Sequence, residues 1–416
     1  MISAAPAQQM QGEALAARIE VLAQFSSEPD ALTRLTLTPA HRDAADLVVG
    51  WMAQAGMDVH IDALATVVGR YEGTDPAGKT LLIGSHIDTV RNAGKYDGNF
   101  GVIAAIAAVD RLNRESTKLP FAIEILAYGD EEGVRYPSTL TGSRAVAGTF
   151  EQAALDDKDA DGVSRREALA RFGIDPAYAA TQARDPARVL AYVEVHIEQG
   201  PVLEAQGFPV GIVTAINGAT RGAITVTGRS GHAGTQPMSM RSDALTAAAE
   251  MILAIERIGR STRGLVATVG RIETPRGAVN IVPGAVAMSL DVRSPSDDER
   301  REAVERIETE IAAIAARRGV SAKFACSHDM PAAPCDASLM DALEQSFLHL
   351  GFTPYRLASG AGHDAMSFRG RIPIAMIFAR CKAGVSHNPA EYASPGDMEA
   401  ATAVLYDFIR MLSRER

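Results

Sequence analysis

The sequence has few cysteines, few aromatic residues and no long apolar run. Its three cysteines, Cys326, Cys335 and Cys381, are odd in number and form no C-x-x-C pair. A disulfide framework is therefore not expected, and a reducing, cytoplasmic location is favoured. No uncharged apolar stretch approaches the ~20 residues that span a bilayer, and the first residues lack a basic segment followed by an apolar core. We expect a soluble protein without a membrane partner.

Basic residues are also in deficit, with 41 Lys and Arg against 51 Asp and Glu, which gives a net charge of −10. Nucleic acid is therefore not an expected partner, because phosphate binding needs a basic surface. A small anionic substrate is still compatible with this charge, since a single arginine can bind a carboxylate. The 416 residues, 47% of them hydrophobic, predict a globular chain of two or three domains.

Short, continuous apolar runs indicate the first domain. They lie at 80–84, 121–128, 191–197 and 374–378 and are typical of buried strands in a mostly parallel sheet. Two further strands are expected at 57–61 and 66–71, and helices at 12–24, 39–55, 100–114, 337–350, 362–368 and 395–412. This alternation predicts an α/β domain with helices on both faces of the sheet, formed by residues 1–212 and 329–416.

The pattern changes between residues 213 and 328. Strands at 221–227, 265–272, 285–293 and 320–325 combine with helices at 243–258 and 296–317 in the order strand-helix-strand-strand-helix-strand. This order predicts an inserted α+β domain of ferredoxin-like type. In the strand 285–293, Met288, Leu290 and Val292 should face inward, which leaves Asp291 and Arg293 on the open face.

Histidines and acidic residues lie in Gly-punctuated segments at the ends of the predicted strands. The segments are GSHIDTV, KYDGNFG, GDEEGV, EVHIEQG and GVSHNPAE, and they contain His86, Asp88, Asp97, Glu131, Glu132, His196 and His387. Ligands bind at the carboxyl ends of strands in open α/β sheets. Imidazoles and carboxylates from separate strands are what a site for two hydrolytic metal ions needs. The sequence therefore points to a metallohydrolase.

The residue types suggest separate roles. Asp97 has two carboxylate oxygens and could bridge two cations, and Asp88 could accept the second ring N–H of His86. We assign Glu132 as a ligand and Glu131 as the general base that takes a proton from the attacking water. Each residue alone is more simply a structural histidine, a surface acid or a turn, so the metal site rests on their joint occurrence.

A second group of polar residues lies in or near the inserted domain. Arg293 could clamp a carboxylate, His232 could stabilise an oxyanion and Asn280 could bond an amide. Gln199 follows the His196 strand, and Gly360 belongs to a Gly-rich turn whose N–H groups could meet an anion. An ordinary ion pair of Arg293 with Asp291 is the simpler interpretation, and a capped helix start explains the turn equally well.

The segments GSHIDTV, YDGNFGV, GDEEGVRYP, EVHIEQGPVLE, GHAGTQPM, VNIVPG, DVRS, SGAGHDA and SHNPAE run in order across almost the whole chain. With them the chain resembles the dinuclear metal-dependent amidohydrolases, the group of allantoate amidohydrolases, N-carbamoyl-L-amino-acid hydrolases and β-ureidopropionases. This group belongs to the aminoacylase-type metallopeptidase superfamily. The resemblance implies a catalytic domain, a smaller lid that also forms a homodimer, and two Zn²⁺ or Mn²⁺ ions.

By matching motif positions, the resemblance implies that His86, Asp97 and His196 bind one ion and that Asp97, Glu132 and His387 bind the other. It implies that Glu131 is the base, and that Gln199, His232, Asn280 and Arg293 contact substrate, with His232 reaching the partner subunit's site. From its Gly-rich turn, Gly360 is a further candidate substrate contact. Val134-Arg135-Tyr136 stands where Ser-Arg-Phe is common, and Gln236 where Thr is common. Both departures would bear on substrate choice.

The activity expected from this resemblance is hydrolysis of a ureido C–N bond in a small carboxylate-bearing substrate. Allantoate is the first choice, because VRYPSTLTGS and SGAGHDAMSF resemble chains of that type. N-carbamoyl-L-amino acids are the alternative, since they too carry a ureido group and a carboxylate. More distant alternatives are an aminopeptidase or deacylase with the same metals, and a catalytically silent binding protein. The intact set of ligands and Glu131 argue against a silent protein.

Overall fold

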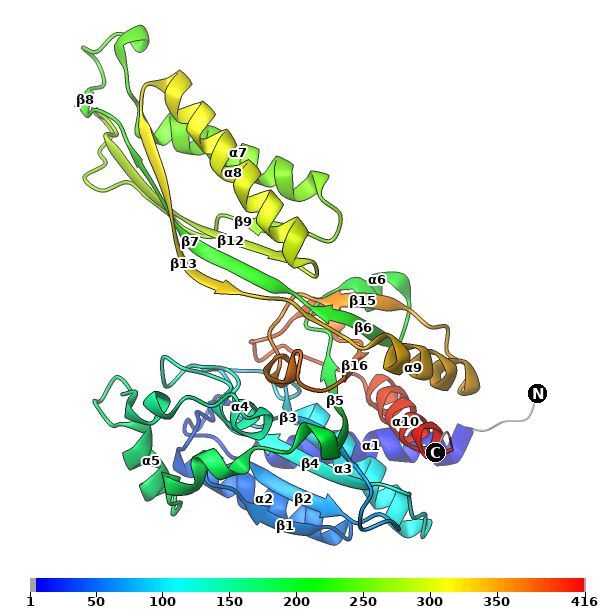
Figure 1. The fold of residues 1–416 in the computed structure, drawn as a ribbon. Helices are drawn as coiled ribbons and strands as arrows, with labels where there is room; N and C mark the ends of the chain where they lie inside the picture. Colours follow the sequence, from blue (N-terminus) through cyan, green and yellow to red (C-terminus); the bar gives the residue numbers. More distant parts are fainter. Residues whose placement is uncertain (1–4, 415–416) are drawn as a thin grey trace. The chain divides into compact units, whose positions relative to one another are not determined.

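The computed structural model describes residues 5–414, which fall into two compact units. Unit 1 spans Met1–Thr214, Pro334–Leu357 and Ala361–Arg416, and unit 2 spans Ala215–Ala333 and Ala358–Gly360. Each unit has a hydrophobic core of its own, and Figure 1 shows the helices and strands of both units. Among the residues described, no helix combines the length and the apolar character that crossing a bilayer requires.

Unit 1 is organised around a nine-stranded sheet with the order β1-β2-β4-β3-β5-β16-β6-β14, in which β15 pairs with β6. Its strands are β1 (Asp58–Ile61), β2 (Val67–Tyr71), β3 (Thr80–His86), β4 (Ala122–Tyr128), β5 (Val189–Ile197), β6 (Val210–Ile216), β14 (Ala333–Pro334), β15 (Arg356–Ser359) and β16 (Ile374–Ala379).

The centre of this sheet is parallel. The neighbours β4, β3, β5 and β16 run in one direction, and all their residues except Thr80 are buried. These are the strands that the continuous apolar runs predict, which confirms the assignment. At the flanks, β2 is antiparallel to β4 and to β1, and β6 is antiparallel to β16. The sheet is therefore mixed, with a parallel core.

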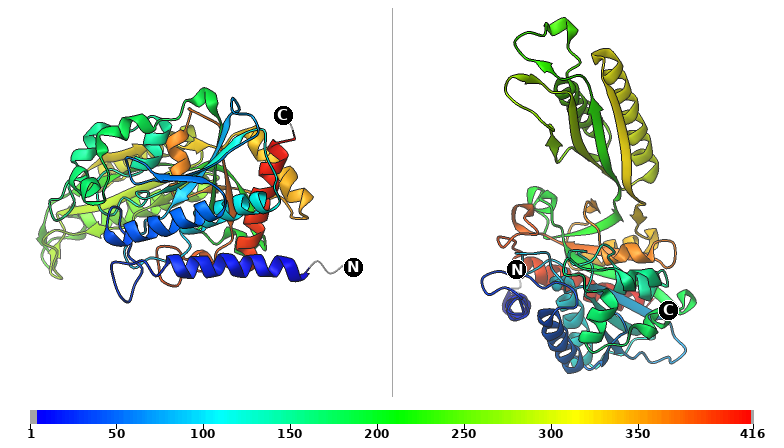
Figure 2. Two further views of the ribbon diagram at one scale, coloured as in Figure 1. Left: turned by 90° about the horizontal axis from the view of Figure 1, so that it is seen from below. Right: turned by 90° about the vertical axis from the view of Figure 1, so that its left-hand side faces the viewer.

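Both faces of the sheet are covered. Val193 and Val195 of β5 belong to the core formed with α3 (Asn99–Arg114) and α10 (Pro395–Leu412). The alternate residue Tyr192 stacks on Phe368 at 4.3 Å, so it faces the opposite layer. On the first face, α1 (Ala5–Leu22) packs beside α10 (Figure 2, left).

The remaining helices of unit 1 are α2 (Pro39–Gln54), α4 (Thr141–Ala147), α5 (Arg165–Arg171), α6 (Val202–Gln206) and α9 (Ala337–His349). The α-helix predicted at 362–368 is instead a short 3-10 helix, Asp364–Phe368. The Ala365 N–H at its start donates to Glu194 at 3.0 Å. A carboxylate of the chain itself therefore caps the start of this 3-10 helix.

Unit 2 contains β7 (Gly218–Thr227), α7 (Ala244–Ser261), β9 (Val266–Thr268), β10 (Ile272–Glu273), β12 (Ala285–Ser294), α8 (Asp297–Arg318) and β13 (Ser321–Met330). Its antiparallel sheet has the order β10-β12-β7-β13, with β9 also paired to β12, which is a ferredoxin-like arrangement. The single strand predicted at 265–272 is split into β9 and β10. In the interval between these two strands, the Gly270 and Arg271 N–H groups donate to the Ser289 hydroxyl.

The burial pattern of β12 separates the two faces of this sheet. Met288, Leu290 and Val292 are at most 2% exposed and pack with α7 and α8, which lie along one face (Figure 1). Asp291 and Arg293 occupy the other face and are partly exposed. The inward and outward positions predicted from the alternation are confirmed.

Candidate metal centre

The sheet topology of unit 1 brings the predicted ligands together. His86 ends β3, Glu131 and Glu132 follow β4, and His196 lies near the end of β5. His387 lies eight residues after β16. Because these four strands are adjacent and parallel, their carboxyl ends share one edge of the sheet. Asp97 reaches the same edge from the turn before α3.

The two oxygens of Asp97 face different imidazoles. Oδ1 lies 3.1 Å from Nε2 of His196 and 3.8 Å from Nε2 of His86. Oδ2 lies 3.1 Å from Nε2 of His387, and that nitrogen is 3.5 Å from Oε2 of Glu132. Two groups of metal-binding side chains thus meet at Asp97, and in each group the ligand atoms lie within 4.8 Å of one another.

The outer nitrogens of two imidazoles are already engaged. Nδ1 of His86 lies 3.0 Å from the Asp88 carbonyl oxygen, and Nδ1 of His196 lies 2.8 Å from the Ile197 carbonyl oxygen. A carbonyl oxygen accepts only, so each Nδ1 carries a proton, and each Nε2 faces Asp97 with a lone pair in the neutral ring or with an N–H when the ring is protonated. Lone pairs and a carboxylate that face one another need a proton or a cation between them, so the donor set fits a metal ion.

The Asp88 carboxylate has other hydrogen-bond partners than the His86 ring that the sequence led us to expect. Its carboxylate lies 3.5 Å from Nδ1 of His86, farther than its own carbonyl oxygen. The carboxylate instead accepts the backbone N–H groups of Glu131 at 3.1 Å and Glu132 at 3.2 Å. Asp88 therefore joins the His86 segment to the segment that carries both glutamates.

The electrostatics of the site favour added positive charge. Burial, with repulsion from Asp97, raises the pKa of Glu132 to about 7, and burial together with neighbouring carboxylates raises the pKa of Glu131 well above its usual range. Burial would also raise the pKa of Asp97, but its hydrogen bonds with His196 and His387 outweigh burial and hold it low. The hydrogen bond with Asp97 raises the pKa of His387 to about 9. A divalent cation would stabilise this excess of carboxylates.

A glycine keeps the first group compact. Gly98 has φ 65°, and a Cβ placed on it would lie 2.4 Å from the His86 imidazole. Any side chain at this position would displace that ring and strain the backbone. The Gly after Asp97 in the KYDGNFG segment is therefore required by the packing of His86.

Gln199, expected to contact substrate, is bonded within the site. Its Nε2 donates to Oδ2 of Asp97 at 2.8 Å and to the Ser386 hydroxyl at 3.1 Å. The structure also brings in Glu391, which the sequence reasoning did not single out. Its carboxylate accepts the N–H of Asp97 at 3.1 Å and the Ser386 hydroxyl at 2.8 Å. The only sequence signal for it is its place at the end of the GVSHNPAE segment.

A third grouping of potential ligands consists of Glu194, His196 and His363. It shares His196 with the first group. The Glu194 oxygens already accept the Ser85 hydroxyl at 3.1 Å and the Ala365 N–H at 3.0 Å. We therefore do not assign an ion to it.

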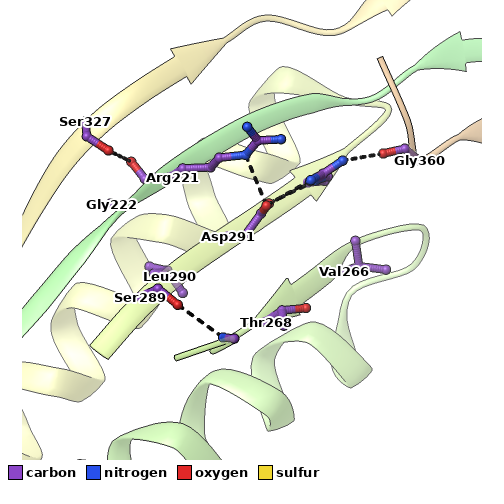
Figure 3. Close-up of a pocket in the computed structure, with 11 residues that line it drawn as sticks. Arg221, Gly222, Val266, Thr268, Ser289, Leu290, Asp291, Ser327 and Gly360 are labelled. Carbon is purple, nitrogen blue, oxygen red and sulfur yellow. Dashed lines mark hydrogen bonds and ion pairs between the residues drawn. The ribbon is translucent and has the colours of Figure 1, made fainter. Parts of the chain in front are cut away.

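Two of the predicted substrate contacts lie together in unit 2. Arg293 donates to Asp291 at 2.9 Å and to the Gly360 carbonyl oxygen at 2.7 Å, so the expected ion pair is formed. Both residues line a pocket of about 560 Å³ on the open face of the sheet. Arg221 lies there as well and donates to Asp291 at 3.1 Å (Figure 3).

His232 and Asn280 occupy the other end of unit 2. His232 lies on β8 (Gly231–His232), which pairs with β11 (Ile281–Val282), and the Ala233 N–H donates to the Asn280 carbonyl oxygen at 2.9 Å. β11 comes just before Ala285, where β12 begins, whereas Arg293 lies next to the last residue of β12. At ~3.3 Å per residue, Ala285 and Arg293 are roughly 26 Å apart. His232 and Arg293 of one chain therefore cannot touch the same small molecule.

Comparison with known proteins places the chain in a family context. Residues 82–411 match the model of peptidase family M20/M25/M40. The chain is 39% identical to the N-carbamoyl-L-amino acid amidohydrolase of Geobacillus stearothermophilus over 97% of its length and 99% of that relative. It is 38% identical to the allantoate deiminase of Arabidopsis thaliana over 94% of its length and 81% of that relative. The resemblance drawn from the motifs is confirmed.

The fold is shared with solved structures. A hydantoinase/carbamoylase family amidase from Burkholderia multivorans matches with a TM-score of 0.90 and 30% identity, over 97% of this chain and 98% of that one. The similarity covers nearly the full length of both chains and therefore includes the segments of both units.

Proposed function

Because the chain belongs to peptidase family M20/M25/M40, we propose that it is a dimetal amidohydrolase that cleaves a ureido C–N bond in a small carboxylate-bearing molecule. The observation that carries this proposal is the placement of Asp97, whose two oxygens each lie 3.1 Å from the Nε2 of a different histidine. A shared carboxylate between two ligand groups is the arrangement that a two-metal hydrolase needs.

His86, Asp97 and His196 would hold one ion, and Asp97, Glu132 and His387 would hold the other. Nitrogen and oxygen ligands of this kind suit Zn²⁺ or Mn²⁺. When bound, such ions lower the pKa of water and polarise a carbonyl group.

Glu131 would take the proton from the attacking water and deliver it to the departing nitrogen. Burial raises its pKa well above the usual range, which brings a carboxylate closer to the basicity that a general base needs near neutral pH. Asp88 would hold Glu131 in place, since it accepts that residue's backbone N–H at 3.1 Å.

Arg293 would bind the substrate carboxylate beside the backbone of Gly360. Its guanidinium already bonds one carboxylate, that of Asp291, through Nε at 3.0 Å and Nη2 at 2.9 Å. Gln199 would contact the ureido group, and Asn280, which lies beside His232 at the other end of unit 2, would do so from the partner subunit. In this scheme unit 2 serves as a lid over the metal centre.

We also propose a homodimer in which His232 serves the active site of the partner subunit. The roughly 26 Å of β12 between Ala285 and Arg293 separates the two ends of unit 2. His232 could stabilise the oxyanion of a substrate whose carboxylate is bound by Arg293 only if the two residues belong to different chains.

Allantoate is our first choice of substrate, and N-carbamoyl-L-amino acids are the second. The segment VRYPSTLTGS after Glu132 favours the first, and the similarity to the Geobacillus amidohydrolase favours the second. A cytoplasmic location rests on three cysteines that are all free.

Ammonia release tests the proposal. The purified chain, stripped of metal and supplied with Zn²⁺ or Mn²⁺, is offered allantoate, N-carbamoyl-L-amino acids and dipeptides in parallel. Ammonia from a ureido substrate that requires added metal would support it. Cleavage of dipeptides alone would favour a peptidase and contradict the proposal. Ammonia from allantoate but not from carbamoyl amino acids would decide between the two substrates.

A further inference from the structure

Glu391 is a buried carboxylate that has no part in the chemistry proposed above. Its exposed fraction is 4%. It lies in the loop between β16 and α10, four residues after His387. Three hydrogen-bond donors converge on its two oxygens: two from the distant segment of Asp97, and one from Ser386 in the same loop.

One oxygen holds the segment that carries Asp97. Oε1 accepts the backbone N–H of Tyr96 at 2.8 Å and that of Asp97 at 3.1 Å. Both bonds act on the peptide units next to the Asp97 side chain, just before Gly98 and the start of α3. They therefore set the position from which the Asp97 carboxylate projects.

The other oxygen holds the segment that carries His387. Oε2 accepts the Ser386 hydroxyl at 2.8 Å. The next residue, His387, has φ 53°, a left-handed conformation that residues with a side chain adopt only when their surroundings enforce it. The contact with Ser386 is next to this strained position and restrains it.

The surroundings leave Glu391 no freedom to move. A Cβ on Gly94 would lie 2.3 Å from the Cβ, Cδ and Oε1 atoms of Glu391, so the carboxylate is packed directly against the Gly94 backbone. A fixed carboxylate between two loops can define the distance between them.

We infer that Glu391 is a positioning residue that sets the distance between Asp97 and His387, and thereby the affinity of the site for the ion held by Asp97, Glu132 and His387. This inference rests on the proposed function. Ligands that depend on outer hydrogen bonds typically lose 10–100-fold in metal affinity when those bonds are removed.

The test is a metal titration of the full-length chain after removal of bound metal. Zn²⁺ is added in competition with a chelator, and the ions bound per chain and their dissociation constants are measured. Glu391→Gln keeps the shape of the side chain but removes its charge and one acceptor. We expect this variant to bind the ion of Asp97, Glu132 and His387 about 10–100-fold more weakly and the first ion with a smaller loss, because Asp97 serves both ions but His387 serves only the second.

Asp62→Asn is the matched control. Asp62 is also a buried carboxylate, and its Oδ1 accepts two backbone N–H groups, from Leu64 at 2.8 Å and Thr66 at 2.9 Å. It lies in the turn between β1 and β2, which carries none of the proposed ligands. We expect it to bind both ions with wild-type affinity. Equal weakening in this control would overturn the inference.

Ser386→Ala keeps the inference testable should Glu391→Gln fail to fold. It removes the bond to Oε2 together with the hydroxyl's contacts to Oδ2 of Asp97 and to Nε2 of Gln199, both 3.1 Å long, so the second ion should again lose more affinity than the first. Wild-type affinity for both ions in either variant, provided that the variant is folded, would overturn the inference and leave the proposed function intact. A wild-type chain that binds no ion would overturn the proposed function itself, and the inference with it.

Discussion

Nε2 of His387 lies 3.1 Å from Oδ2 of Asp97, although about 290 positions separate the two residues in the chain. The other oxygen of Asp97 faces His196 at the same distance. A substitution at Asp97 should therefore affect both ligand groups, and one at His387 only the second.

Asp97→Asn removes the charge that the two groups share while it keeps the side-chain volume. We expect this variant to lose both ions and His387→Ala to lose only one, because His387 belongs to a single group. Metal analysis of the gel-filtered proteins measures this directly. Equal metal content in the two variants would contradict a shared Asp97.

Glu131→Gln separates proton transfer from metal binding. General acid–base catalysis contributes about 10²–10⁴-fold, so kcat should fall by that factor, whereas both ions should stay bound because Glu131 is in neither ligand group. Steady-state ammonia release and metal content together check this prediction. A kcat within tenfold of the wild type would remove Glu131 from the role of base.

The pH dependence of metal binding follows from the raised pKa values of the second group. A metal ligand must lose its proton, and the pKa is about 7 for Glu132 and about 9 for His387. Affinity for the second ion should therefore rise with pH, about tenfold per unit between pH 7 and 9 and more steeply below pH 7. Titrations at pH 6, 7 and 8 measure the slope.

The metal-free protein should show the opposite trend. The raised pKa of His387 contributes stability that is present below its unfolded pKa of 6.5 and is lost as pH rises through about 9. The raised pKa of Glu132 likewise costs stability as pH rises from 4.5 through about 7. The increase in Tm caused by metal should therefore grow with pH. An increase that shrinks from pH 6 to pH 8 would contradict this assignment.

Arg293→Ala should weaken substrate binding. Hydrogen bonds to a charged group contribute ~1.5–3 kcal/mol, so we expect KM to rise about 10–100-fold. Arg221→Ala is the control, because Arg221 donates to the same Asp291 carboxylate at 3.1 Å but has no assigned role. Its KM should change less than about threefold. An equal rise in both variants would mean that the loss comes from the Asp291 ion pairs and not from the substrate carboxylate.

Mixed oligomers test the proposed role of His232. A chain with His232→Ala and a chain with Glu131→Gln are each expected to be nearly inactive. Their mixture, after exchange of subunits, should regain activity, because one site then combines an intact Glu131 with the partner's His232. If every mixture stays inactive while exchange is demonstrated by mass, His232 acts within its own chain.

The parallel centre of unit 1 and the meeting of the candidate metal ligands at one edge of its sheet could be predicted because each depends on a short segment. Continuous apolar runs mark β3, β4, β5 and β16, and the polar residues that follow them in the chain must lie at the edge where parallel strands end. The alternation of Met288, Leu290 and Val292 likewise identified the buried face of β12.

Contacts between distant segments could not be predicted in this way. The Ala365 N–H that meets Glu194 links residues about 170 positions apart, at the start of a 3-10 helix where an α-helix is expected from the sequence. The amide of Gln199 lies on Asp97 and Ser386 because β5 and the loop after β16 meet there, a contact that no single segment of the sequence predicts.

The sequence by itself determined which side chains are available for catalysis and at which strand ends they lie, because apolar periodicity and turn residues act over a few neighbouring positions. Only the tertiary structure decided how the loops are spaced: that Asp97 lies between His196 and His387, that Glu391 ties two loops together, and that His232 and Arg293 lie at opposite ends of unit 2. Those distances result from the packing of segments far apart in the chain, and no local pattern encodes them.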